Sequence, residues 1–314
     1  MLKRRRSDFA EQFVTPLLAE AAKVGISVAE ITAIEADTIT GLLGRNGAGK
    51  TTLMQLLTGH RAPTSGRVAV FGRSPYEDDD VLSRICFIKE SQRYPDHFRV
   101  GDAVSAAACL YPGWDGDLAA TLLADFDLPS KGPIKKLSRG MTSAVGIVLG
   151  LASRAPVTLF AKPYLGLDAV ARQLFYDRLL ADYAEHPRTV VLSPHLIEEI
   201  SDLLEHVLLI DRGRVLLDAD AESLRATALT VTGPARQGAT FGSVHRVLHL
   251  ESMAGQSRAV VRASSAADSR VATDLGLTVE PACIQQLVVA LGRNARGAAT
   301  TSTTPAADLE GVVR

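Results

Sequence analysis

A glycine-rich segment at residues 44–51 is the strongest chemical signal in this sequence. It reads Gly-Arg-Asn-Gly-Ala-Gly-Lys-Thr, matches the pattern G-x-x-x-x-G-K-[ST], and lies between the apolar stretch Thr38–Leu43 and the helix-like stretch Thr51–Leu57. Glycines let backbone N–H groups curve around phosphate oxygens, and a helix that begins near Lys50 adds the positive end of its dipole. Lys50 would reach the β- and γ-phosphates of a nucleotide, and the Thr51 hydroxyl would bind Mg²⁺. The residues expected to hold the nucleotide are Gly44, Arg45, Asn46, Gly47, Ala48, Gly49, Lys50, Thr51 and Thr52.

The segments around this motif predict the fold class. Strand-like apolar runs alternate with helix-like ones, as in Val157–Phe160, Ala169–Leu180 and Thr189–Ser193. This alternation is typical of an α/β domain whose helices cover a mainly parallel sheet. Short β segments that indicate antiparallel strands at one side lie at Arg67–Phe71, Val207–Ile210 and Val215–Leu217.

Changes in composition predict the domain boundaries. Ala- and Leu-rich helical stretches such as Gly101–Leu110 and Leu118–Phe126 dominate from about residue 91 to 155, which indicates a helical subdomain inserted into the sheet domain. We expect this nucleotide-binding domain to cover residues 1–225. A small accessory domain would follow over 226–292, with alternating strands and a final amphipathic helix near Ile284–Leu291. The Ala- and Thr-rich residues 293–314 are predicted to be a disordered tail.

Composition excludes several classes of function. The formal net charge of the 314 residues is -1, so no global field favours nucleic acid or an anionic membrane. The three cysteines, Cys86, Cys109 and Cys283, are far apart in the sequence, which argues against a zinc site or a disulfide framework. The longest run of apolar and small residues, Ser143–Ser153, is about half of the roughly 20 residues that a membrane-spanning helix needs.

Further segments resemble those of ABC-type ATPases, in the order that this family uses. Residues 137–141, Leu-Ser-Arg-Gly-Met, resemble the signature sequence LSGGQ, and residues 166–168, Gly-Leu-Asp, resemble the D-loop. Residues 193–195, Ser-Pro-His, resemble the switch-histidine loop. The resemblance covers about residues 38–225 and implies a P-loop NTPase of the RecA-like type with bound ATP and Mg²⁺.

The resemblance also implies roles for single residues. Ser138 and Gly140 would lie at the start of a helix that points at the γ-phosphate bound by an opposite subunit, with Ser138 as the helix N-cap. Asp168 would complete the same shared site, and His195 would approach the γ-phosphate. Pro194 replaces a small polar residue of the family and restricts Ser193 to extended conformations, which puts this approach of His195 in doubt.

One segment departs from the family's pattern at the residues that act in hydrolysis. An apolar strand followed by Asp-Glu-Pro is typical of the family, whereas residues 157–163 read Val-Thr-Leu-Phe-Ala-Lys-Pro. Pro163 fixes the alignment, so Ala161 replaces the Asp that helps hold Mg²⁺ and Lys162 replaces the Glu that polarises the attacking water. Losing a positioned base typically slows a reaction by about 10²- to 10⁴-fold. Lys162 would instead add positive charge near the γ-phosphate, which favours bound ATP without activating water.

A second substitution offers a replacement for the lost ligand. Aligning Ile85–Glu90 with the family's strand before the Q-loop puts Glu90 at the position of a Gln that contacts Mg²⁺ and water in the family. Because hard oxygen donors suit Mg²⁺, Glu90 would serve with Thr51 as a metal ligand and contribute to catalysis. The alternative, to which we give equal weight, is that Glu90 is a solvated carboxylate in a loop with no metal-binding role.

These observations predict the ATP-binding subunit of an ABC transporter, impaired in hydrolysis, that powers or gates a separate membrane permease. It would be cytoplasmic and peripheral on the inner face of the cell membrane. A heterodimer with a second, hydrolysing ATP-binding subunit is favoured over a homodimer, and no nucleic acid partner is expected. Two alternatives stay open: a regulatory or structural nucleotide-binding module without a permease, and an active ATPase with unusual residues.

Overall fold

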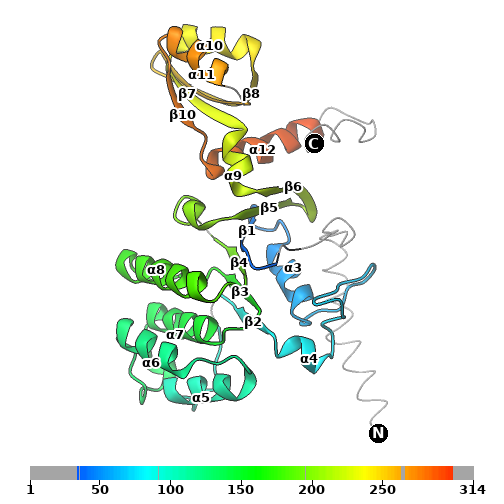
Figure 1. Ribbon diagram of the computed structural model, residues 1–314, viewed down its shortest axis with the longest axis vertical. Coiled ribbons are helices and arrows are strands. Elements are labelled where there is room, and N and C mark those ends of the chain that lie inside the picture. Colours follow the sequence, from blue (N-terminus) through cyan, green and yellow to red (C-terminus); the bar gives the residue numbers. More distant parts are fainter. Residues whose placement is uncertain (1–33, 35, 91, 195, 263–265, 300–314) are drawn as a thin grey trace. The chain divides into compact units, whose positions relative to one another are not determined.

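The computed structural model describes residues 34, 36–90, 92–194, 196–262 and 266–299. The chain divides into two compact units, Met1–Asp220 and Ala221–Arg314 (Figure 1). The division falls earlier than the predicted boundary after Arg225, because the helix at Ala221–Ala226 contacts elements of the second unit. None of the helices among the described residues combines the length and the hydropathy that crossing a membrane requires.

The first unit is built on a six-stranded sheet with the strand order β2-β3-β4-β1-β5-β6. All neighbouring strands pair in parallel except β6, which pairs antiparallel with β5 at one edge. This arrangement is the P-loop NTPase fold, as the sequence predicted. The strands run over Ile39–Leu43 (β1), Ile85–Ile88 (β2), Val157–Ala161 (β3), Thr189–Ser193 (β4), His206–Asp211 (β5) and Arg214–Asp220 (β6).

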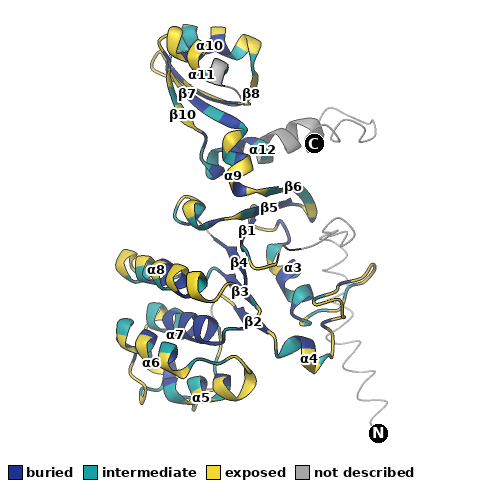
Figure 2. Ribbon diagram, viewed as in Figure 1, coloured by how far each residue is buried: buried dark blue, intermediate teal, exposed yellow. Residues whose placement is uncertain are grey.

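Helices cover both faces of this sheet, with α3 on one side and α7 and α8 on the other (Figure 1). Strands β1, β2 and β4 are buried along their whole length, which explains their continuous apolar sequences (Figure 2). Leu53 and Met54 of α3 pack into a core with Leu42 of β1 and Leu159 of β3. Among the described residues of this unit, the helices are α3 (Lys50–Leu57), α4 (Asp79–Leu82), α5 (Val100–Leu110), α6 (Gly116–Asp125), α7 (Arg139–Ala152) and α8 (Ala169–Glu185), with short 3₁₀ turns at Ile134–Lys136 and Ser201–Leu203.

The predicted helical segment at residues 91–155 contains α5, α6 and α7. Nine consecutive residues of α7, Ala144–Ala152, are buried, because this helix contacts α5 and α6 as well as β2 and β3 (Figure 2). Gly150 permits the closest approach, since a Cβ atom there would lie 2.5 Å from Cε1 of Phe160 on β3. The same helix therefore fixes the helical segment to the sheet.

One predicted strand is wrong and another pair is confirmed. Residues 67–71 form no strand, only an isolated bridge between Val70 and Arg73, because Phe71 has a left-handed φ of 54°. Strands β5 and β6 form the expected antiparallel pair. Arg212 and Gly213 join them with φ angles of 48° and 76°, the conformation of a tight hairpin turn.

The second unit contains a four-stranded antiparallel sheet with the order β10-β7-β9-β8. Its β-α-β-β-α-β sequence of elements is a split β-α-β arrangement. Phe241 of α10, Ala272 of α11 and Val261 of β9 belong to its buried core. The elements are α9 (Ala221–Ala226), β7 (Ala228–Pro234), α10 (Ala235–Val244), β8 (Arg246–Met253), β9 (Gln256–Arg262), α11 (Ala266–Asp274), β10 (Thr278–Pro281) and α12 (Ile284–Ala299).

The end of α12 corrects the predicted tail. A disordered tail was expected from residue 293, but α12 continues to Ala299. Residues 293–299 read Arg-Asn-Ala-Arg-Gly-Ala-Ala, and the high helix propensity of Ala and Arg outweighs the single glycine. Residues 300–314 lie outside the described part of the chain.

A buried ion-pair network joins the helical segment to the sheet. The Asp182 side chain on α8 is only 3% exposed and lies 3.1 Å from Arg154 and 2.6 Å from Arg188. Arg154 also lies 3.0 Å from Asp115, the residue that caps α6. One carboxylate thus pairs with two guanidinium groups from different segments of the unit, and Asp115 supplies the second negative charge.

We expect Asp182→Ala to lower the free energy of unfolding by about 3 to 5 kcal/mol, because removing one partner of a buried ion pair leaves uncompensated charge. Chemical denaturation of the purified chain measures this change. Asp177→Ala is the matched control, since Asp177 is exposed on the same helix and should cost less than about 0.5 kcal/mol. Equal effects of the two substitutions would show that the network contributes nothing.

Candidate functional site

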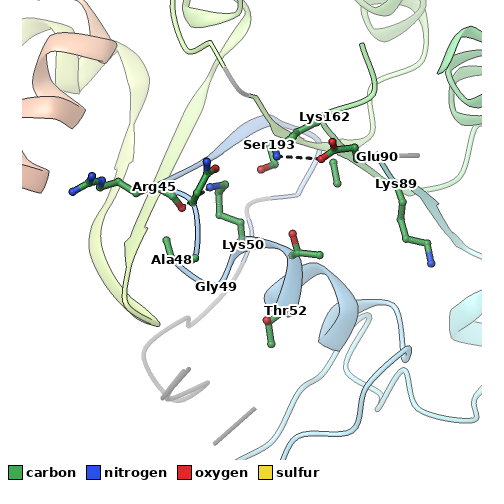
Figure 3. Close-up of a pocket in the computed structure, with 13 residues that line it drawn as sticks. Arg45, Ala48, Gly49, Lys50, Thr52, Lys89, Glu90, Lys162 and Ser193 are labelled. Carbon is green, nitrogen blue, oxygen red and sulfur yellow. Dashed lines mark hydrogen bonds and ion pairs between the residues drawn. The ribbon is translucent and has the colours of Figure 1, made fainter. Parts of the chain in front are cut away.

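The carboxyl ends of β1, β2, β3 and β4 open into one cavity of about 530 Å³. Parallel pairing places these four strand ends at the same edge of the sheet, where ligands of α/β folds bind. The cavity is lined by residues 45–52, by Lys89 and Glu90, by Ala161 and Lys162, and by Ser193 (Figure 3). Two positions that sequence reasoning had not assigned to the site, Lys89 and Ser193, therefore contribute to its wall.

The glycine-rich loop requires glycine at its first position. Gly44 has a φ of 143°, and a Cβ atom there would lie 2.2 Å from the carbonyl oxygen of Ile210 on β5. Gly49 also has a positive φ, 108°, at the point where α3 begins. The loop therefore turns sharply between β1 and α3, and its path depends on residues without side chains.

The N-terminus of α3 differs from those of α6, α7 and α8. Each of these three helices has a side chain that accepts a hydrogen bond from a first-turn N–H, whereas Gly49 gives α3 no side-chain cap. The first N–H bonded back into α3 is that of Leu53, to the Gly49 carbonyl. The N–H groups before it are available to an anion in the cavity, and the helix dipole favours negative charge at the same point.

Lys50 lies at the junction of the loop and the helix. Its Nζ donates hydrogen bonds to the carbonyl oxygens of Gly44, at 2.6 Å, and Arg45, at 2.9 Å. Figure 3 shows Lys50 beside Arg45 in the loop. Burial lowers the pKa of this ammonium group, and the positive charge of Lys162 lowers it further. Each cause disfavours the charged form, so an anion bound between the two lysines would relieve both costs.

Lys162 follows the end of β3 directly. Its backbone has a left-handed φ of 52°, and its N–H donates to the Ser193 carbonyl at 3.2 Å. The side-chain Nζ lies 3.1 Å from Oε2 of Glu90 (Figure 3). Arg139 of α7 lies 3.6 Å from the other oxygen of the same carboxylate. Glu90 is thus bound by two cations, and sequence reasoning missed the contact with Arg139 because α7 is distant in the sequence.

Few oxygen atoms among the described side chains around the cavity are placed to meet a magnesium ion. The Thr51 hydroxyl is exposed beside the loop, but Ala161 offers no oxygen and Glu90 is engaged in ion pairs. Nowhere among the described residues do three or more His, Cys, Asp or Glu side chains gather as metal ligands. The metal-binding role expected of Glu90 would require it to exchange both cationic partners for the ion.

The residues expected to act across a subunit interface lie at two neighbouring helix starts. The Ser138 hydroxyl accepts from the Met141 N–H at 3.1 Å, so the predicted N-cap is confirmed, and Asp168 caps α8 in the same way through Ala171. Gly140 packs against the backbone of Gly166, where a Cβ atom would meet the Gly166 carbonyl oxygen at 2.5 Å. Both caps are exposed. His195 lies outside the described residues, and its expected role stays a prediction.

Comparisons with known proteins fit this geometry. A family model described as ABC transporter matches residues 31–164, which include the glycine-rich loop and Lys162. The ABC transporter ATP-binding protein YtrB of Bacillus subtilis (strain 168) is 26% identical over 192 residues, 61% of this chain and 66% of that protein. The bacitracin transport ATP-binding protein BcrA of Bacillus licheniformis is 28% identical over 190 residues, 60% of this chain. The aligned region spans 62% of BcrA, so roughly a third of each relative has no counterpart in the alignment.

A solved structure shows the same fold. A dimeric ATP-binding cassette in a post-hydrolysis state, bound to ADP and Pi, superposes with a TM-score of 0.53 at 22% sequence identity. The superposition covers 60% of this chain and 88% of that one.

Substituting the first glycine of the loop tests whether the loop forms the binding site. We expect Gly44→Ala to weaken ATP binding by about tenfold or more, because the added methyl group would displace the loop from Ile210. Gly47→Ala is the control, since no heavy atom lies within 4 Å of a Cβ there and only the strain of its positive φ remains, about 1 to 2 kcal/mol. Titration calorimetry measures both affinities, and wild-type affinity in Gly44→Ala would contradict the assignment.

Proposed function

This chain belongs to the ABC transporter family of ATP-binding proteins, and from that premise we propose that it binds ATP at residues 44–52, powers or gates a separate membrane permease, and hydrolyses ATP poorly at its own site. The loop, the uncapped start of α3 and Lys50 supply the groups that grip a triphosphate. The cargo and the direction of transport would be set by the permease.

The pair Ala161–Lys162 is the observation that carries the proposal of poor hydrolysis. Both residues line the cavity that contains the phosphate loop, and the resemblance aligns Lys162 with the carboxylate that polarises water. A protonated amine accepts no proton, so Lys162 cannot act as a general base. Glu90 lines the same cavity, but its carboxylate is engaged in ion pairs with Lys162 and Arg139.

The proposal of a heterodimer rests on the two exposed helix starts. In the family, as the resemblance implies, the signature helix of one subunit completes the ATP site of the other. Ser138, Gly140 and Asp168 retain this pattern, whereas the chain's own site lacks the hydrolytic carboxylate. A second ATP-binding subunit with an intact site would therefore hydrolyse ATP while this chain holds its own. The structural relative that superposes on this unit is itself dimeric.

Restoring the two acidic residues tests directly whether their replacement impairs hydrolysis. We expect the purified chain to hydrolyse ATP slowly and the double variant Ala161→Asp, Lys162→Glu to be about 10²- to 10⁴-fold faster, because the variant regains a base that polarises water. Phosphate release with MgCl₂ present measures both rates. The single variant Ala161→Asp is the control and should stay slow. Rapid turnover by the unmodified chain would refute the proposal.

The heterodimer proposal predicts the behaviour of the chain on its own. We expect it to stay monomeric with saturating ATP in sedimentation velocity at micromolar concentration, because a dimer of two copies would carry the added positive charge of Lys162 at both of its ATP sites. Addition of a hydrolysing partner subunit should give a dimer. An ATP-dependent dimer of this chain alone would favour the homodimer instead.

A further inference from the structure

The wall of the cavity is mainly positively charged, whereas a site that binds a metal ion is lined by negatively charged groups. Four of its lining residues are cationic, Arg45, Lys50, Lys89 and Lys162, and Glu90 contributes a carboxylate. Burial lowers the pKa of Lys50, and the positive charge of Lys162, which lines the same cavity, lowers it further. Positive charge is therefore concentrated where the phosphates of a nucleotide would lie.

We propose that this site takes ATP in its metal-free form, with the Lys162 ammonium providing the positive charge that Mg²⁺ otherwise brings to the phosphates. Metal-free ATP is more negative than its magnesium complex by the charge of the ion. A site lined by carboxylates repels that form, and the metal offsets the repulsion. Here Ala161 removes one carboxylate and Lys162 replaces another with a cation, so the metal-free nucleotide meets attraction instead.

The ion pairs of Glu90 show how Lys162 becomes available to the ligand. Lys162 lies 3.1 Å from one oxygen of Glu90, and its side chain is 31% exposed, so it has room to turn from the carboxylate to an incoming phosphate. Arg139 remains 3.6 Å from the other carboxylate oxygen and compensates Glu90 after that exchange. The γ-phosphate thus replaces Glu90 as the partner of Lys162, and the carboxylate is not left unpaired.

This inference deepens the proposed function and rests on its assignment of the ATP site. The test is the dissociation constant of the full-length purified chain for ATP, measured by titration calorimetry with excess MgCl₂ and again with EDTA at matched ionic strength. We expect ATP binding in EDTA to be at least as tight as in MgCl₂, because excess Mg²⁺ leaves little ATP in the metal-free form that the site takes. A loss of affinity in EDTA overturns the inference while the ATP site stands. Absence of ATP binding in both buffers refutes both proposals.

Two variants identify the residues responsible. Lys162→Met should weaken binding in EDTA by about tenfold or more, since a charge-assisted contact to phosphate is lost, and should make binding depend on MgCl₂. Lys135→Met removes the same charge from an exposed site outside the cavity and should bind as the unmodified chain does. Equal affinities of the two variants in EDTA would overturn the role of Lys162. Thermal unfolding of each variant checks that it is folded.

Glu90→Gln separates this inference from a metal-binding role of Glu90. If Lys162 must leave Glu90 to reach phosphate, removing the carboxylate charge should preserve or increase the affinity for ATP in EDTA. The same substitution should leave the affinity in MgCl₂ within about threefold of that of the unmodified chain. A selective loss of affinity in MgCl₂ would identify Glu90 as a ligand of Mg²⁺ and overturn the inference.

Discussion

Parallel pairing of β2 with β3, β3 with β4 and β4 with β1 is the constraint on which the rest of the first unit depends. It brings the ends of four strands to one edge of the sheet, so that loops distant in the sequence form a single cavity. The strands are buried, and the few side chains at their ends therefore set the charge of that cavity. A change at one strand end, such as Lys162, alters the chemistry without altering the fold.

Binding a nucleotide and hydrolysing it require groups of different charge. The backbone amides at the start of α3 and the ammonium of Lys50 favour a bound triphosphate whatever happens to the γ-phosphate afterwards. Hydrolysis needs in addition a group that accepts a proton from water, and the resemblance aligns Lys162 with that group. Under the proposed function, tight binding and slow turnover would be two consequences of the same substitution.

Local patterns made most of the fold and the loop predictable from the sequence. The G-x-x-x-x-G-K-T motif and Ser138 depend on neighbouring residues, and the structure places both as expected. Contacts between distant segments were not predictable: Arg139 reaches Glu90 only because α7 packs on β2 and β3. The strand predicted at Arg67–Phe71 failed because nothing in its alternating pattern reveals the left-handed backbone of Phe71.

A crystal structure with ATP and Mn²⁺ tests the central claim most directly, because the anomalous scattering of manganese locates any bound metal and the electron density shows the partner of Lys162. The account predicts no metal peak at the phosphates, with Lys162 Nζ at a phosphate oxygen and Glu90 beside Arg139. A manganese ion bound by Thr51 and Glu90, with Lys162 turned away from the nucleotide, would contradict it.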